Sequence, residues 1–181
     1  IWARTLVISA GVIMNMLFAF GVYTYVAAQW GLPQLDTTRI GRIETDLLPP
    51  GTEALAQVEP GSTVVRIGES AVDDWGDLQE GLYASAPGPL SIELAGPSRT
   101  VEIRIPTEEP QRRELVRAVD SWIDAGVGAV NPGSPADRAG LEAGDRIVSV
   151  GEVAVRNWYD FVREVESRPG QRVEIAIERE G

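Results

Sequence analysis

The side chains that most often perform catalysis are scarce in this sequence of 181 residues. It contains no histidine, which removes the usual general base, the base of a serine triad and the commonest zinc ligand. It contains no cysteine either, so disulfides and thiol nucleophiles are excluded. Zinc sites in hydrolases normally include a nitrogen or sulfur donor, and no aspartic-protease loop is visible. We therefore expect no catalytic residue and no metal ligand in this chain, and a role in recognition.

Almost all charged residues lie in the part of the chain that begins at Asp36. All 27 acidic residues and 15 of the 16 basic residues lie there, which gives this part a net charge of −12. Such a surface repels phosphate instead of releasing counterions from it. Nucleic acid and anionic lipid are therefore excluded as expected partners of this part.

The N-terminal segment is apolar enough to cross a membrane. Residues Thr5 to Ala28 carry no charge, and as a helix these 24 residues would be about 36 Å long, against about 30 Å for a hydrocarbon core. The alternative is a signal peptide, because Arg4 precedes an apolar run that ends in Val-Ala-Ala, but signal cores are usually about 7–15 residues long. Because the chain opens with Ile-Trp and not Met, we expect a middle portion of a longer protein.

A stripe of small residues runs along this helix. Gly11, Asn15 and Ala19 recur every four residues, so they share one face. Small residues allow close approach of a second helix, and the Asn15 amide can bond across that contact. We expect these three residues to pack against other membrane helices.

Two later segments repeat each other. Residues 144–161 echo residues 61–78 at a constant offset of 83, with eight of 18 positions identical. The identical pairs are Gly61/Gly144, Val65/Val148, Gly68/Gly151, Glu69/Glu152, Ala71/Ala154, Val72/Val155, Trp75/Trp158 and Asp77/Asp160. We therefore expect two copies of one small domain, similar but separable, with Trp75 and Trp158 equally buried.

Local signals define the elements of the second copy. We expect a short strand at 127–130 and a one-turn helix that Ser134 caps and Gly140 ends. A longer helix should start after Asn157, with Trp158, Phe161, Val162 and Val165 as its apolar stripe. The alternation of Val173, Ile175 and Ile177 predicts a strand.

The first copy follows the same plan. Asp74 should cap a helix, and two alternating strands around 90–94 and 101–105 should form a hairpin whose second strand has no counterpart in copy two. We expect an α+β fold with a membrane helix and exit loop at 1–35, one copy at 36–106, a polar linker at 107–118 and the other copy at 119–181 without its C-terminal strand.

Residues 128–155, GAVNPGSPADRAGLEAGDRIVSVGEVAV, resemble a PDZ domain of the bacterial protease type. The membrane motif Ala10-Gly11 with Asn15 and Ala19, then Gly31-x-Pro33 and the tandem, resembles the second membrane helix of the site-2 protease family. Val12 departs from that pattern, where proline is usual, and so does Pro49-Pro50-Gly51-Thr52, where the first copy lacks the Ser-Pro-Ala turn.

This resemblance implies a parent enzyme that is an intramembrane zinc metalloprotease. An HExxH helix and a later Asp-Gly pair, both absent from this chain, would hold the zinc. The tandem would lie on the extracytoplasmic (periplasmic) side of the bacterial inner membrane, over the active-site entrance. It would admit a membrane-spanning substrate such as an anti-sigma factor only after that substrate had been shortened. The lipid bilayer and the other helices of the protease would be its further partners.

PDZ domains bind peptides as an added strand beside a helix and hold the terminal carboxylate with backbone amides. The resemblance makes Trp122, Ile123 and Val162 the candidate groove residues, with Asp124 disfavouring a carboxylate. The alternatives are a membrane-anchored PDZ adaptor that binds peptide termini without catalysis, and the PDZ part of a serine protease of the high-temperature-requirement type. The latter's Gly-Asn-Ser-Gly-Gly motif is absent.

Overall fold

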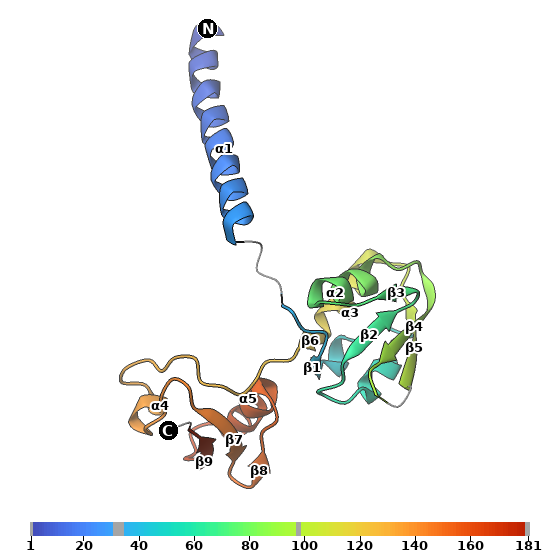
Figure 1. The fold of residues 1–181 in the computed structure, drawn as a ribbon, viewed down its shortest axis with the longest axis vertical. Coiled ribbons are helices and arrows are strands. Elements are labelled where there is room, and N and C mark those ends of the chain that lie inside the picture. Colours follow the sequence, from blue (N-terminus) through green and yellow to red (C-terminus); the bar gives the residue numbers. More distant parts are fainter. Residues whose placement is uncertain (1, 31–34, 97–98, 180–181) are drawn as a thin grey trace. The chain divides into compact units, whose positions relative to one another are not determined.

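The computed structural model describes residues 2–30, 35–96 and 99–179 (Figure 1). The chain forms two compact units, Ile1–Gln34 and Leu35–Gly181. Residues 31–34 of the expected exit loop lie outside the described ranges. Helices and strands are mixed, which confirms that part of the predicted fold class.

The first unit is one long helix, α1 (Trp2–Trp30). Within it, the 21 residues Ser9–Gln29 have a mean hydropathy of 1.6 and are long and apolar enough to cross a membrane. In the described ranges no other helix meets these criteria. The predicted span is therefore a single candidate membrane helix.

The first copy of the repeat is built on a four-stranded antiparallel sheet in the order β3-β2-β4-β5. Two helices and two 3₁₀ turns accompany the sheet, and β1 pairs separately with β6. The elements are β1 (Ile40–Ile43), η1 (Thr45–Leu47), η2 (Glu53–Gln57), β2 (Val64–Ile67), β3 (Ser70–Ala71), α2 (Trp75–Ala84), β4 (Gly88–Leu94), β5 (Arg99–Ile105), α3 (Glu109–Arg117) and β6 (Val119–Ser121).

Alternation along the hairpin strands creates the core of this copy. Val101, Ile103 and Ile105 of β5 are buried, whereas Glu102 and Arg104 between them are exposed. Because successive side chains of a strand point to opposite faces, one face of β5 is apolar. That face packs in one cluster with the apolar side chains of α2, β2 and β4.

The second copy has a three-stranded sheet in the order β8-β7-β9. Its elements are α4 (Pro135–Arg138), β7 (Arg146–Val150), β8 (Val153–Ala154), α5 (Trp158–Glu166) and β9 (Ile175–Glu178). The expected strand at 127–130 does not form. Instead, Val127 exchanges backbone hydrogen bonds with Gly144 and Asp145, and Gly126 forms an isolated bridge with Arg146.

The two copies share their local backbone conformations. Gly61 and Gly144 have φ of +97° and +95°, and Gly68 and Gly151 both have φ of +58°. Side chains with a Cβ rarely adopt these values, so identical glycines mark identical turns. Helices α2 and α5 both begin one residue after a side-chain cap. The sequence repeat is therefore a repeat in structure.

Two expectations were wrong. The segment 107–118 is not merely a polar linker, because it contains α3, whose Leu115 is fully buried in the core of the first copy. The two tryptophans are not equally buried either: Trp75 is 7% exposed, whereas Trp158 is partly exposed and stacks at a tilt on Phe161. Both errors concern long-range packing, which local patterns do not report.

Candidate functional site

The start of helix α5 is fixed by a side-chain cap. Asn157 lies just before the helix, and its Oδ1 accepts a hydrogen bond from the Asp160 amide at 2.9 Å. Capping satisfies one of the helix amides that have no partner within the helix. The same position in the first copy is Asp74, which accepts from the Asp77 amide at 2.9 Å. The predicted cap at Asp74 is confirmed, and so is the predicted start of a helix at Asn157.

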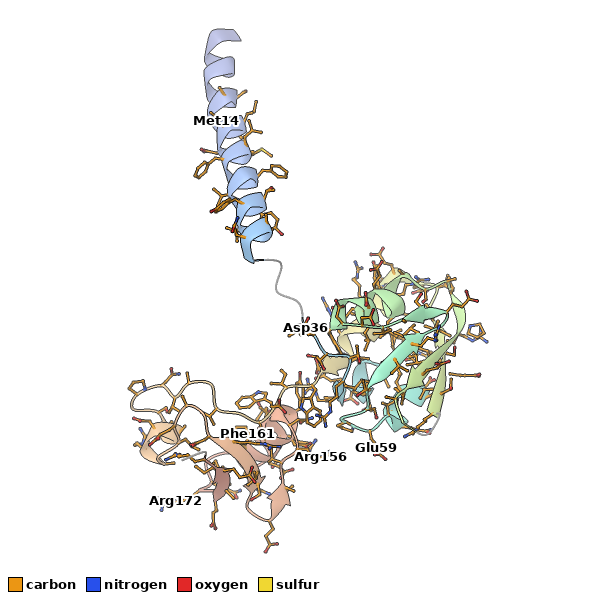
Figure 2. The ribbon with its side chains drawn as sticks, in the orientation of Figure 1. Met14, Asp36, Glu59, Arg156, Phe161 and Arg172 are labelled. Carbon is orange, nitrogen blue, oxygen red and sulfur yellow. The ribbon has the colours of Figure 1, made fainter. Side chains whose placement is uncertain are left out.

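A groove of about 890 Å³ lies beside α5. Its walls come from α4 with the residues after it, from α5, and from the segment that leads into β9. None of the residues that line it is acidic, and two are arginines, Arg138 and Arg172. Figure 2 labels Phe161 on α5 and Arg172 before β9. The lining residues are Ser134, Pro135, Ala136, Arg138, Ala139, Leu141, Phe161, Val165, Gly170, Gln171, Arg172, Val173 and Ile175.

The first copy shows what occupies the same face there. At the offset of 83, Leu78 and Leu82 correspond to Phe161 and Val165. Both leucines are 2% exposed and share a core with the apolar side chains of β5, whereas Phe161 is half-buried and Val165 is exposed. In the first copy the equivalent face is therefore covered by β5.

Strand pairing gives the same result. Strand β4 pairs with β2 on one side and β5 on the other. Its counterpart β9 pairs with β7 in the matching register, since Ile67↔Ile92 becomes Val150↔Ile175. Within the described residues β9 has no partner on its other edge. In the first copy this edge carries β5, and at the offset of 83 its equivalent would begin at residue 182, after the last residue of this sequence.

The structure does not bring the predicted groove residues together. Arg39 lies over the ring of Trp122, with its guanidinium carbon 3.5 Å from the ring centroid, and the Trp122 indole donates to Asp124. The Ile123 carbonyl accepts from the Trp158 amide at 2.8 Å. Trp122 and Ile123 therefore lie at the junction between the copies and do not line this groove, and their part in peptide binding stays a prediction.

On helix α5, the lining residues differ from the predicted one. Val162 is half-buried but does not line the groove, whereas Phe161 and Val165 do. The signal was present in the sequence, because all three belong to the same apolar stripe. The stripe identified the apolar face but not which part of it would remain uncovered.

An ion pair fixes the turn between the groove wall and β7. Asp145 accepts from Arg179 at both oxygens, 2.5 Å to Nε and 2.8 Å to Nη2, and from the Glu142 amide at 2.8 Å. The hydrogen bonds from Arg179, then that from the Glu142 amide, lower the pKa of Asp145 to about 2. Arg179 also donates to the Gly140 carbonyl at 3.0 Å. These bonds hold the turn that follows Leu141.

A second carboxylate is buried in the first turn of α5. Asp160 is 3% exposed and receives hydrogen bonds from Arg156 at 2.9 Å and Arg163 at 2.7 Å. Burial raises the pKa of this carboxyl, but the hydrogen bonds from Arg156 and Arg163 outweigh burial and lower it below its usual value. Asp160 is therefore an anion that holds the start of α5.

The membrane-helix residues singled out in the sequence lie on one face of α1. Gly11, Asn15 and Ala19 are exposed in this structure. A Cβ added at Gly11 would meet no atom within 4 Å. Their packing against other helices stays a prediction. In the described ranges no three histidine, cysteine, aspartate or glutamate residues are grouped so that they could hold a metal ion.

Comparisons with known proteins agree with these features. Residues 126–179 match the PDZ domain family. Protease RseP of Yersinia pestis is 29% identical over 190 residues, and the regulator of sigma-E protease RseP of Escherichia coli is 27% identical over 199 residues. A putative zinc metalloprotease of Pasteurella multocida is 30% identical over 194 residues. Each match covers 98% of this chain and 41% of the relative.

The chain thus spans about two fifths of the length of these curated relatives. The groove lies within residues 126–179, which match the PDZ domain family. Helix α1 lies outside that range and is covered only by the matches to the protease relatives, which extend over 98% of this chain. Over 98% of its length the chain matches a fragment of the regulator of sigma-E protease family, which is of the site-2 protease type, and its residues 126–179 form a PDZ domain.

Proposed function

We propose that this chain is the substrate-filtering portion of an intramembrane zinc metalloprotease of the site-2 type. The match over 98% of the chain to relatives named as proteases carries this proposal. Zinc and its ligands would come from the rest of the parent enzyme, because this chain has no histidine and such sites normally use one. The contribution of this chain is control of access.

The first copy, residues 36–121, is on this proposal a second PDZ-like domain. The shared glycine conformations, helix caps and strand register support this reading. The two domains would lie on the extracytoplasmic side of the bacterial inner membrane, anchored by α1. A reporter enzyme fused after Leu35 should be active only if it is of the kind that works outside the cytoplasm, and activity of a cytoplasmic reporter there would contradict this orientation.

The substrate class is a membrane-spanning protein such as an anti-sigma factor. The sigma-E names of the relatives suggest that class. The PDZ domain is the part that would contact an extended segment of the substrate, because PDZ domains bind peptides as an added strand.

Deleting residues 36–181 from the intact enzyme, with both flanking helices kept, tests the filter. A zinc-dependent protease should remain but lose discrimination, cutting full-length and pre-shortened substrates alike. The matched control is a variant with both flanking segments intact and Glu102→Gln on the exposed face of β5, which should keep the original selectivity. A deletion variant that stays fully selective would exclude the filter role.

The second candidate function is an adaptor that only binds peptide termini. The parent protein also distinguishes this function from that of a protease. If the parent protein is an adaptor, the polypeptide before α1 contains no HExxH motif. The variant that lacks residues 36–181 would then show no protease activity with any substrate. The same chain would still bind peptides in the groove. Reading the gene on both sides of this segment is the quickest discriminating observation.

A further inference from the structure

Asn157 occupies a position between the two copies of the repeat. It is fully buried, and its side chain makes two hydrogen bonds in opposite directions. Its Oδ1 accepts from the Asp160 amide and caps α5, while its Nδ2 donates to the Gly41 carbonyl of β1 at 2.8 Å. Gly41 and Asn157 are 116 residues apart in sequence. One side chain therefore joins the helix of the PDZ domain to a strand of the first copy.

The surroundings of this bond leave little free space. A Cβ built on Gly41 would overlap the Ser121 carbonyl and lie 2.7 Å from Cε2 of Tyr159. The Arg42 guanidinium carbon lies 4.6 Å from the centroid of the Tyr159 ring, and Arg42 donates twice to Asp120, at 2.6 and 2.9 Å. Strands β1 and β6 and the first turn of α5 are thus in direct contact.

Asp74, the equivalent residue of the first copy, distinguishes the two hydrogen bonds of Asn157, the one that caps the helix and the one to Gly41. Asp74 has nearly the same backbone conformation, φ −140° and ψ 179° against φ −149° and ψ 176°. It caps α2 with one carboxylate oxygen. A carboxylate has no N–H group to donate, so capping alone does not require an amide. The carbonyl of Gly41 is what requires an amide at position 157.

We propose that the Asn157 side chain holds the PDZ domain and the first copy together as one rigid body. The hydrogen bond from its amide N–H to the Gly41 carbonyl performs this role, and its capping oxygen does not. Helix α5 also carries Phe161 and Val165 of the groove. Whatever the groove binds is then held at a fixed position relative to the first copy. This inference does not depend on the protease assignment.

On this proposal the hydrogen bond from Asn157 to Gly41 keeps the two copies together, in place of the two separable domains expected from the sequence. Buried Gly41 would lose its partner if α5 moved away, and an unsatisfied buried carbonyl costs free energy. Figure 2 labels Arg156 of the PDZ domain and Glu59 of the first copy. Hydrogen bonding to Asp160 raises the pKa of Arg156, and the negative charge of Glu59 adds to this effect.

The test measures the distance between the copies in the full chain, held in lipid nanodiscs. The chain has no cysteine, so Glu102→Cys on β5 and Glu166→Cys on α5 provide two exposed, specific positions for spin labels. Pulsed electron spin resonance then gives the distribution of distances between them. The labelled parent chain should give one narrow distance.

Three variants decide the outcome. Asn157→Asp keeps the cap but loses the donor and places a negative charge against the Gly41 carbonyl. Asn157→Ser keeps a capping oxygen but is too short to reach that carbonyl. Both should lose the narrow distance while circular dichroism shows that α5 is retained. The control Asp74→Asn should leave the distance unchanged.

The proposal is overturned if Asn157→Asp or Asn157→Ser keeps a distribution as narrow as that of the parent chain, or if the parent chain itself gives a broad one. If Asn157→Asp fails to fold, the Asn157→Ser distance decides by the same criterion. A loss of the narrow distance in the Asp74→Asn control would also overturn the proposal, because that residue makes no bond across the junction.

Discussion

Trp75 and Trp158 occupy the same position of the repeat and each begins a helix, yet only Trp75 is buried in a core. The amide of each donates to the carbonyl of the segment that enters its own copy, Leu35 for Trp75 and Ile123 for Trp158. The main-chain role is therefore the same in both copies. The side-chain role differs, because the core of the first copy contains the apolar residues of β5 and α3, whereas among the described residues the buried apolar core of the second consists of Ala125, Ile147, Val150 and Val155.

Truncating the two tryptophans should therefore have unequal effects. Trp75→Ala should lower the free energy of unfolding by about 3–5 kcal/mol, the usual cost of removing a buried aromatic side chain. Trp158→Ala should cost clearly less, because part of its ring is already in contact with solvent. Urea unfolding followed by far-ultraviolet circular dichroism measures both. Equal losses would contradict the burial difference.

Helix α3 should behave as part of the first core and not as a linker. Leu115→Ala should cost about 2–5 kcal/mol, because the side chain is 0% exposed and leaves a cavity. Arg113→Ala on the same helix is the control: Arg113 pairs with Glu109 on the surface, and such pairs contribute about 0–1 kcal/mol. If Leu115→Ala is as stable as Arg113→Ala, the segment is a linker after all.

The junction between the copies should not tolerate a methyl group at Gly41. Gly41→Ala places that group against Tyr159 and the Ser121 carbonyl, and overpacking of this kind typically costs about 1–3 kcal/mol. Gly126→Ala is the matched control, because no atom lies within 4 Å of its added Cβ. Thermal unfolding should show a lower midpoint for Gly41→Ala alone. A control that falls equally would refute the packing argument.

Acid should destabilise the PDZ domain through Asp145. Its pKa is about 2 in the folded state, against 3.8 for the unperturbed group, so the unfolded chain binds the proton first as pH falls. The contribution is fully present above about pH 4 and is lost as pH falls toward 2. Arg179→Gln removes the cause of the shift and should flatten the dependence of the unfolding midpoint on pH between about 4 and 2.

The control for this titration is Arg146→Gln. Arg146 lies 3.9 Å from Glu178, and both side chains are exposed, so its removal should leave the acid dependence as it is in the unmodified chain. Asp160, whose pKa is also lowered, contributes to the acid dependence of both variants. An unchanged profile in Arg179→Gln would show that the pair with Asp145 does not govern acid stability.

The small-residue face of α1 predicts contact with another membrane helix in the intact enzyme. Asn15→Leu should remove an interhelical hydrogen bond worth about 0.6–2 kcal/mol and reduce the stability or activity of the enzyme. Met16→Leu lies one residue further on, at a different angle around the helix, and should have no such effect. Identical behaviour of the two variants in the parent protease would show that the face does not pack.

The sequence by itself determined the local features of this protein. The apolar run predicted α1, the spacing of Phe161 and Val165 predicted the stripe of α5, and the identity of Asp74 predicted the cap of α2. The helix features depend on residues within one or two helical turns of each other. The shared turns depend on backbone conformations that only glycine adopts easily, and the two copies are recognised from the constant offset of 83 residues. Local chemistry is sufficient for each of them.

Only the tertiary structure decided which surfaces meet. In the structure Leu115 is buried although its segment is polar in composition, and Trp122 lies at the junction between the copies under Arg39. The Asn157 amide donates to the Gly41 carbonyl. Each of these contacts joins segments far apart in sequence. Helical periodicity and capping preferences carry no information about such a partner, because the partner is set by how complete faces of α5, β1 and β6 fit together.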